Sequence, residues 1–521
     1  MTLTESASFD AVVIGAGLGG LSVAALLAQK EGKRVLVVER ENGIGGRIHH
    51  YKGDDIRTVD DYLGPLQAST GWLVHSEPKL EQLIDGGLLS GYSFELGMHD
   101  IVNGAHSRMC HILESLGVPV EIVPLKACGF WNDGTLFELQ RGSFPWMTGE
   151  SYSDLRKILS GMLRMPVDEV RNHYRESLRD YVEARTSDAT VLDFFNILGA
   201  FTVGMNSARE LSAGEFMLIT RMPMAAGLHF ADGTLGQMGG DSFMEMAHNL
   251  AGIVTAAGGE VRTGQAVSSI VVDQGKTTGV IVDGHEVRAT TVISNVPISL
   301  ALDQLLPAAA VPADFANKVK NLRSSGAFVP IFGLSKSVID IPGMLMAHIP
   351  IDDPAFPDGI VLGYEAHSLF VDGKAPDGKE IIECWVGLDT QQLRTLKETG
   401  KIQLAVDAVR SFFSTQHPGF DEALEWALYP AFDFVVSVAP TPEQAWDSML
   451  DPQCPGIDGL FFVGDSVKNY GGFMDGVAYG ALLCASEVTG RDYLQEILPE
   501  YQRELTPANE AHPIAQLSPS I

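Results

Sequence analysis

The feature that most constrains the fold is a glycine-rich turn near the N-terminus, between an apolar run and a segment rich in Ala and Leu. Residues Phe9 to Ile14 (FDAVVI) are apolar enough to form a strand that is buried on both faces of a parallel sheet. They lead into residues 15–20 (GAGLGG), and a helix is predicted over Leu21 to Gln29, with Gly32 as its C-terminal cap. A second strand is predicted over Arg34 to Val38. The order is therefore strand, G-x-G-x-x-G, helix and strand.

This order favours a site for a dinucleotide over a glycine loop that binds nothing. Gly15 makes the turn, Gly17 lets the backbone approach a pyrophosphate, and Gly20 allows the helix to pack on the strand. The helix N-terminus offers free N–H groups and positive dipole charge. Glu39 ends the second strand, 19 residues past Gly20, where it can accept hydrogen bonds from an adenosine ribose. The predicted contacts in the turn are Gly15, Gly17, Leu18, Gly19 and Gly20.

A second signature follows directly after this acid. Residues 39–47 (ERENGIGGR) resemble the corresponding stretch of flavoproteins of the phytoene desaturase, carotenoid isomerase and amine oxidase group, in which a glycine pair precedes an arginine. The resemblance implies FAD as the dinucleotide, with Arg40, Gly45, Gly46 and Arg47 at the cofactor. Beside a pyrophosphate, Arg47 would offset phosphate charge that the helix dipole alone does not. In isolation, the same residues are more typical of a surface turn with a solvated arginine.

A third signature of the same group stands near the C-terminus. Leu460 to Gly464 (LFFVG) is predicted to be a buried strand that leads into Asp465, and residues 470–478 (YGGFMDGVA) open an Ala-rich helix. The resemblance implies that Asp465 holds the ribityl or phosphate region and that the helix N-terminus points at the pyrimidine edge of the flavin. A helix N-terminus there stabilises the negative charge that hydride transfer leaves on the ring. The implied contacts are Gly464, Asp465, Gly472, Met474 and Val477.

Two segments between these signatures also match the family pattern. In residues 91–107 (GYSFELGMHDIVNGAHS), the resemblance places Gly97, Met98 and His99 near the isoalloxazine. His99 is a candidate catalytic residue, although a lone histidine is more often a hydrogen-bonded structural residue. The resemblance also implies that Val267 contacts the adenine of FAD through its backbone, as the matching residue does in the family. No second G-x-G-x-x-G follows, whereas pyridine-nucleotide disulfide reductases carry a separate NAD(P) fingerprint in mid-chain.

The spacing of the signatures predicts an α/β fold with two domains. One is a Rossmann-type FAD-binding domain whose parallel sheet is discontinuous in sequence, and the other is an α+β substrate domain. Residues 52–90 look like an insertion relative to the family pattern, and their role is not evident from the sequence. The predicted division is 1–105, 235–300 and 450–490 for the FAD domain, 106–234 and 301–449 for the substrate domain, and 491–521 for a C-terminal tail that is flexible from Tyr501 onward.

Residues 108–230 are predicted to be mostly helical, and large apolar side chains gather there. Met and Phe suit a pliable lining for an oily substrate, and an ordinary helical core explains them equally well. The cluster comprises Phe194, Phe195, Ile197, Leu198, Phe201, Met205, Phe216, Met217, Met222 and Met224.

Charge and cysteine content exclude several partners. With 36 Lys and Arg against 66 Asp and Glu, the net charge of −30 repels polyphosphates, so nucleic acid is not expected as a partner, and membrane contact would be weak and peripheral. The 5 cysteines are odd in number and include no C-x-x-C pair, which favours a reducing compartment without a disulfide framework or a metal site. The N-terminus lacks the basic start of a signal peptide, so a cytoplasmic location is expected. The oligomeric state stays open.

The leading functional hypothesis is a desaturase, saturase or cis-trans isomerase that transfers hydride between flavin N5 and a hydrophobic small molecule of isoprenoid type. It rests on the likeness of Ala16 to Ala28 (AGLGGLSVAALLA) to the carotenoid branch of the family and on the Met- and Phe-rich segment. Flavin chemistry at N5 mainly requires positioning and exclusion of water, so a catalytic triad is not expected.

The alternative is a flavin amine oxidase acting on a small or hydrophobic amine. In that branch a Gly-Tyr-Met-Glu-Gly stretch supplies one wall of an aromatic cage, and Phe473 keeps an aromatic wall here, with Tyr470 or Trp385 as candidates for another. The cysteine that carries covalent flavin in some amine oxidases has no counterpart near Gly471, so the resemblance implies non-covalent FAD. A flavin protein without turnover is the third hypothesis, and little in the chain supports it. The candidate catalytic residues are Phe473, Tyr470 and His99.

Overall fold

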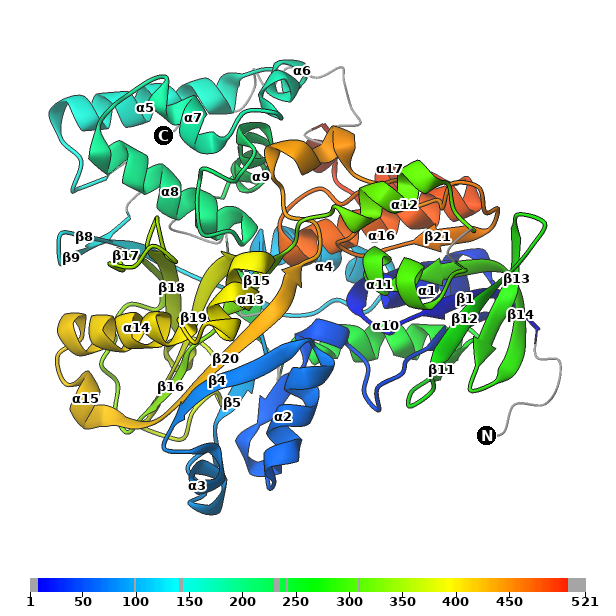
Figure 1. Cartoon of the computed structure of the whole chain (residues 1–521), viewed down its shortest axis with the longest axis horizontal. Helices are drawn as coiled ribbons and strands as arrows, with labels where there is room; N and C mark the ends of the chain where they lie inside the picture. The colour runs from blue at the N-terminus through cyan, green and yellow to red at the C-terminus, as the bar shows by residue number, and fades with distance from the viewer. Residues whose placement is uncertain are drawn as a thin grey trace.

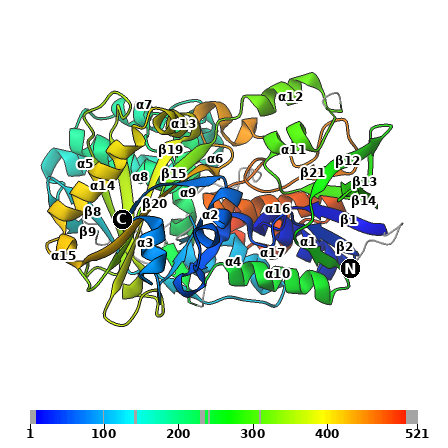
Figure 2. The same cartoon turned by 60° about the horizontal axis from the view of Figure 1, so that its bottom comes forward.

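The computed structural model describes residues 8–97, 100–139, 144–228, 235–239, 242–307 and 310–504. Two large sheets lie next to each other along the long axis, and a layer of helices stands above the second sheet (Figure 1). The view in Figure 2 shows the same separation, with β1 and β2 at one end of the molecule and β8 and β9 at the other. The fold is of the mixed α/β class, as the sequence predicts. Within these ranges no helix is both long and apolar enough to cross a bilayer.

The first sheet is parallel at its centre. β1 pairs in parallel with β2 and with β14, and β14 pairs in parallel with β21 near the C-terminus. Along β1, Ala11 and Val13 pack into one core while Val12 and Ile14 pack into the core on the opposite face. Burial on both faces explains the uninterrupted apolar run. The strands are β1 (Ser8–Ile14), β2 (Val35–Val38), β11 (Glu260–Arg262), β12 (Val267–Asp273), β13 (Lys276–Val282), β14 (His285–Ser294) and β21 (Leu460–Phe462).

Helices cover both faces of this sheet. One face carries α1 (Leu18–Glu31), α10 (Met244–Ala256) and α16 (Phe473–Thr489), and α1 packs against the other two. The opposite face carries α11 (Ile298–Gln304) and α12 (Ala313–Lys320). α12 therefore packs on the first sheet, whereas the division made from the sequence assigns it to the substrate domain.

The second sheet has nine strands and is mostly antiparallel, with one parallel pair between β8 and β17. Helices α13 (Thr390–Glu398) and α14 (Ile402–Gln416) cover one face, and α8 (Ala189–Val203) contacts β17 and β18. The strands are β4 (Gly71–Glu77), β8 (Ala127–Asn132), β9 (Thr135–Glu138), β15 (Ser325–Phe328), β16 (Ile331–Leu334), β17 (Gly343–Ile349), β18 (Ile360–Ala366), β19 (Glu380–Asp389) and β20 (Leu424–Val436).

The segment that the sequence marks as an insertion belongs to the second sheet. It forms α2 (Val59–Ala68), β4 and α3 (Leu80–Asp85), and β4 pairs with β20, with Ala427 opposite Glu77 and Phe432 opposite Gly71. Its apolar side chains share a core with Trp426 and Phe432. The division made from the sequence, which places residues 1–105 in the FAD domain, is therefore wrong for this segment, because it packs with the second sheet.

The chain beyond residue 490 is ordered further than the sequence suggests. It forms α17 (Tyr493–Ile497) and α18 (Glu500–Glu504). The Tyr501 hydroxyl lies 3.2 Å from Nδ1 of His106, and the Gln502 side chain donates to the His106 carbonyl at 2.6 Å. These contacts hold α18 on the molecule, so Tyr501 is not part of a flexible tail.

Candidate functional site

A cavity of about 700 Å³ is lined by residues of both sheets. On one side lie the glycine-rich turn, residues 38–49 and the end of β14, and on the other lie α2 and the last residues of β20. The first residues of α16 close it. All three signatures therefore reach one space, although more than 400 residues separate Gly15 from Gly464 in the chain.

The glycine-rich turn leaves no room for side chains. Gly15 has a φ of +93°, which favours glycine, and a Cβ on Gly20 would lie 2.5 Å from the Gly15 carbonyl oxygen. A Cβ on Gly17 would lie 2.6 Å from Nδ2 of Asn295. Gly17 is also the N-cap of α1 and makes no side-chain cap, so the amides of the first turn stay available to an anion at the cavity wall.

Glu39 is held in a fixed orientation at the end of β2. Its Oε2 accepts a hydrogen bond from the Ala16 N–H at 2.8 Å, and its Oε1 accepts one from the Glu41 N–H at 2.9 Å. The residue lines the cavity and is 8% exposed. Each carboxylate oxygen keeps lone-pair capacity, so Glu39 can still accept hydrogen bonds from hydroxyl groups. Arg40 also lines the cavity, but its Nε donates to the Glu41 carboxylate at the exposed rim.

Arg47 links the second signature to the third. Its Nη2 donates to Oδ1 of Asp465 at 2.8 Å, and its Nη1 donates to the Val435 carbonyl at 3.0 Å. The Ser437 N–H and hydroxyl each donate to the Asp465 carboxylate at 2.9 Å. Burial alone would raise the pKa of Asp465, but the Arg47 guanidinium and the Ser437 hydrogen bonds outweigh it and hold that pKa below its ordinary value. The Asp465 carboxylate therefore stays ionised and fixes the orientation of the Arg47 guanidinium at the cavity wall.

A second arginine–aspartate pair, which no sequence pattern predicts, fixes the start of α16. Asp475, in the first turn of that helix, accepts from Nη1 of Arg108 at 2.6 Å and from the Arg108 backbone N–H at 2.7 Å. Nη1 also donates to the Tyr470 carbonyl at 2.5 Å. Both side chains are buried, at 0% and 1% exposure. The N-cap of α16, Gly472, makes no side-chain cap, so this helix also presents open amides to the cavity.

The predicted catalytic aromatics occupy different surroundings. Phe473 lines the cavity in a left-handed backbone conformation with a φ of +49°, which is rare for a bulky residue and is typical of functional sites. Its ring meets Trp385 edge to face, with 6.4 Å between ring centroids and an interplanar angle of 88°. Among the described residues, neither Trp385 nor Tyr470 lines the cavity.

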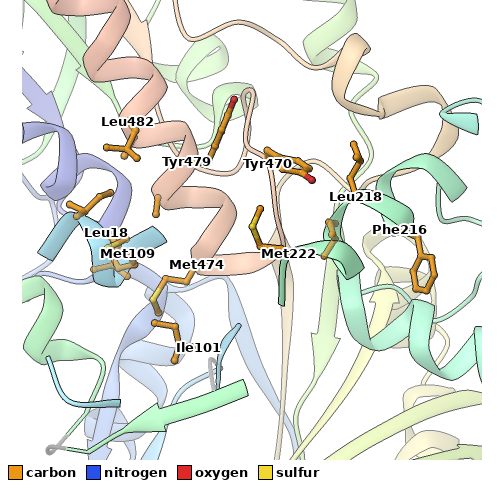
Figure 3. Packing of buried hydrophobic residues seen from close by; sticks show 14 of the residues in the cluster. Leu18, Ile101, Met109, Phe216, Leu218, Met222, Tyr470, Met474, Tyr479 and Leu482 are labelled. Carbon is orange, nitrogen blue, oxygen red and sulfur yellow. The ribbon is translucent and has the colours of Figure 1, made fainter. Parts of the chain in front are cut away.

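Tyr470 is wholly buried beneath the start of α16. It stacks over the Arg108 guanidinium at 5.0 Å and packs with Tyr479 and with Met222 and Leu218 of α9 (Ala213–Ala225), as Figure 3 shows. A molecule in the cavity cannot reach its hydroxyl in this structure. The prediction of a catalytic Tyr470 therefore conflicts with its position.

The far wall of the cavity comes from segments outside the three signatures. α2 and the turn after it contribute Pro65, Ala68 and Thr70, and β20 contributes Phe432 and Phe434. Thr70 has a φ of +63°, and its buried Oγ1 has no hydrogen-bond partner among the described residues. The wall is apolar with few hydrogen-bonding groups, which is the usual character of a site for an apolar ligand.

Most of the predicted cofactor contacts meet at this cavity. Gly20 lies behind the turn and does not line it, and Met98 and His99 lie outside the described residues, so the structure places neither. The contacts that do line it are Gly15, Gly17, Leu18, Gly19, Glu39, Arg40, Gly45, Gly46, Arg47, Gly97, Val267, Gly464, Asp465, Gly472, Met474 and Val477.

Asn295 is a residue of the site that the sequence reasoning missed. It follows β14, and its side chain stands next to the positions that Cβ atoms would take on Gly17 and Gly19. The signal was present, because the carboxyl ends of parallel strands meet at one edge of a sheet, and that edge is where ligands bind.

The Met- and Phe-rich helices form a core and do not line this cavity. Of α9, only Glu215 and Ile219 reach the wall. Of the two explanations that the sequence left open, an ordinary helical core fits these positions. The residues concerned are Phe194, Phe195, Ile197, Leu198, Met205, Phe216, Met217 and Met222.

Comparison with known proteins agrees with this architecture. A family model described as flavin containing amine oxidoreductase matches residues 18–489. The chain is 24% identical over 527 residues to the chloroplastic prolycopene isomerase of Arabidopsis thaliana, covering 92% of this chain and 82% of that protein. It is 26% identical over 321 residues to the all-trans-retinol 13,14-reductase of Macaca fascicularis, covering 57% of this chain and 49% of that protein.

A solved structure of putrescine oxidase bound to putrescine has the same fold. The TM-score is 0.63 at 16% identity, and the likeness covers 93% of this chain and 100% of that one. At this identity the likeness concerns the arrangement of the elements and not the substrate.

Proposed function

The chain belongs to the family of flavin-containing amine oxidoreductases, and on that premise we propose that it uses non-covalent FAD to transfer hydride to or from a hydrophobic substrate. The coarse activity, that of a flavin-dependent oxidoreductase, follows from the family. The proposal goes beyond the family in two respects, which are that the flavin is FAD and that the substrate is hydrophobic.

FAD is supported by the donor set around the cavity. Two uncapped helix N-termini, those of α1 and α16, open onto the same space, and the Arg47 guanidinium, which is paired with Asp465, also lines it. Glu39 offers acceptors for ribose hydroxyls at the end of β2. A dinucleotide carries anionic phosphates and hydroxyl groups that match these partners.

When bound, FAD supplies hydride transfer at N5. The residues of the chain then hold the cofactor, orient the substrate and exclude water. The amides of the first turn of α1 and the Arg47 guanidinium bind the phosphates, and the N-terminus of α16 favours negative charge placed against it. Phe473 and Phe432 narrow the space in which a substrate carbon can lie.

The substrate is proposed to be a long apolar molecule of isoprenoid type that undergoes desaturation, saturation or isomerisation. The observation that carries this is the apolar wall formed by α2 and β20, which no cofactor signature requires. The two relatives compared above, an isomerase and a reductase by name, support the same class. The cytoplasmic location and the weak membrane contact stay predictions from composition.

An amine substrate is the second candidate, because Phe473 keeps an aromatic ring on the cavity wall where the amine oxidase branch has one. Against it, Trp385 meets Phe473 at 88° and Tyr470 is buried and does not line the cavity, so neither forms a parallel wall with Phe473. The amine hypothesis therefore needs a second wall from Phe432 or Phe434.

Anaerobic mixing of the FAD-loaded protein with candidate substrates tests the proposal. A terpenoid that donates hydride is expected to bleach the visible bands of the oxidised flavin, and one that accepts hydride is expected to restore the bands of flavin reduced beforehand. Benzylamine and putrescine should do neither. Bleaching by amines alone would overturn the apolar substrate. Acid precipitation checks the linkage, since non-covalent FAD leaves the yellow colour in the supernatant and covalent flavin keeps it in the pellet.

A further inference from the structure

Glu215 is a carboxyl group on the cavity wall that none of the three signatures includes. It lies in the first turn of α9 and is 2% exposed. Its Oε1 accepts a hydrogen bond from the Trp446 N–H at 2.6 Å. Within the described part of the chain, no lysine, arginine or histidine forms an ion pair with it. A buried acid without a cation, facing a ligand cavity, is a candidate for a role in that cavity.

The local sequence explains why the carboxyl group faces this way. Residues 212–215 (SAGE) have the S-x-x-E pattern of a capping box, and the Ser212 hydroxyl accepts from the Glu215 N–H at 3.3 Å. The reciprocal half is missing, because the Ser212 N–H donates to the Pro440 carbonyl at 2.9 Å instead. The Glu215 side chain is thereby released from the helix end and turns to Trp446.

The charged and titratable groups around Glu215 come from several elements. Asp447 follows Trp446, Tyr174 and Arg175 precede α7 (Leu178–Glu183), and Tyr470 precedes α16. Burial is the largest influence and raises the pKa of Glu215 to about 7. The Trp446 hydrogen bond opposes this rise, Asp447 adds to it, and Arg175 again opposes it. On α9 itself, Arg221 lies near Tyr470 and does not pair with Glu215.

We propose that Glu215 takes up one proton when the anionic dinucleotide binds and then donates a hydrogen bond into the cavity. This rests on the proposed binding of FAD. An ionised Glu215 would share a buried space with phosphate charge, whereas the neutral acid removes that repulsion and adds a donor. The balance is one proton taken from solvent for each FAD bound, and no bond of FAD is made or broken.

Linkage gives the pH dependence its sign. If binding raises the pKa of Glu215 further, the bound state holds more protons than the free state above pH 7. FAD affinity must then fall as pH rises, by up to tenfold for each pH unit. His49 also lines the cavity, but burial lowers its pKa below 6.5, so it is already neutral in this window.

The test is a titration of apoprotein with FAD between pH 6 and 9, followed by flavin fluorescence. For the wild type we expect Kd to rise above pH 7, approaching tenfold per unit, and for Glu215→Gln we expect Kd to stay within about twofold. Glu380→Gln is the matched control, because Glu380 is also buried with a raised pKa but lies on β19 away from the cavity. It should keep the wild-type profile.

Calorimetric titration at pH 8 in buffers of different ionisation enthalpy measures proton uptake without any variant. Close to one proton per FAD is expected for the wild type. FAD binding with no proton uptake, or a Glu215→Gln variant that keeps the wild-type pH profile, would refute the role of Glu215 and leave the proposed function intact. A wild-type protein that binds no FAD at any pH would refute both.

Discussion

The two arginine–aspartate pairs of this protein have the same chemistry and different surroundings. Arg47–Asp465 and Arg108–Asp475 each join an early segment of the chain to the C-terminal signature, at 2.8 and 2.6 Å. The side chains of the first pair are 39% and 12% exposed, and those of the second are 0% and 1% exposed. The first pair borders the cavity, and the second lies in the core beneath it.

The difference shows how one ion-pair motif serves two purposes. Water cannot compensate Arg108 or Asp475 if either loses its partner, so the buried pair holds α16 in place but is intolerant of change. Around Arg47, the open cavity lets water or a ligand take up part of the charge. The cavity pair can therefore contribute to ligand binding without being essential to the fold.

Arg108→Met should have the largest effect on stability. It leaves Asp475 buried without a cation, and removal of one partner of a buried pair lowers the free energy of unfolding by about 3–5 kcal/mol. Urea unfolding of the apoprotein, followed by circular dichroism, measures this. The double variant Arg108→Met/Asp475→Asn should recover part of the loss. A loss below about 1 kcal/mol would mean that the two pairs are energetically alike.

Arg47→Met should separate ligand binding from stability. Loss of a charge-assisted hydrogen bond worth roughly 1.5–3 kcal/mol corresponds to FAD binding about 10- to 150-fold weaker. Because Asp465 keeps both Ser437 hydrogen bonds, the free energy of unfolding of the apoprotein should change by only about 1 kcal/mol. FAD titration and urea unfolding give the two values. If the apoprotein unfolds as readily as Arg108→Met, the assignment of separate roles is wrong.

The dependence of the free energy of unfolding on acid pH should show a smaller effect of the Arg47–Asp465 pair than the two variants above. The folded pKa of Asp465 lies below its ordinary value of 3.8, so its stabilisation is present above that value and is lost as pH falls through the folded value. Arg47→Met should lose less stability than the wild type between about pH 4 and pH 2, by under about 1 kcal/mol because Arg47 is partly exposed. Urea midpoints across this range provide the measurement. If the urea midpoints of the wild type and Arg47→Met fall in parallel with pH, Arg47 does not lower the pKa of Asp465.

Tyr470→Phe should have the smallest effect. The Tyr470 hydroxyl is buried with no hydrogen-bond partner among the described residues, and the contacts of Tyr470 with Arg108 are made by its ring and its backbone carbonyl. Removal of an unsatisfied hydroxyl is expected to change the free energy of unfolding by about 0.5 kcal/mol or less and to leave turnover within about twofold. Steady-state kinetics and urea unfolding test both values. A large loss of turnover would reinstate Tyr470 as a catalytic residue.

The features of the site that were predicted from the sequence are those that depend on neighbouring residues in the chain. The turn at residues 15–20, the acid at Glu39 and the uncapped start of α16 depend on glycine positions and on neighbours in the chain, and the fold class follows from them. Asp465 was located by resemblance, and the structure adds the partners, Arg47 and Ser437, that orient it.

What the sequence did not predict depends on long-range contacts. Arg108 lies 367 residues from Asp475, and no local pattern identifies it as the partner of that aspartate. The pairing of β4 with β20 spans a similar separation in the chain. Hydrophobic periodicity does not distinguish a residue that lines a cavity from one that fills a core, which is why Phe216 and Met222 were open to both explanations. The burial of Tyr470 also depends on distant contacts, because its ring packs on Arg108 and Tyr479 and no local pattern distinguishes this position from one on the cavity wall.

The pairing of β21 with β14 has a consequence for how this protein is made. β1 is translated long before β21, the strand that completes its sheet, and before α16, the helix that closes the cavity. The first sheet therefore cannot be completed until β21 has been synthesised. A nascent or truncated product that stops before α16 lacks one wall of the cavity and exposes unpaired strands to chaperones and proteases, so the cofactor can bind only after α16 has been synthesised.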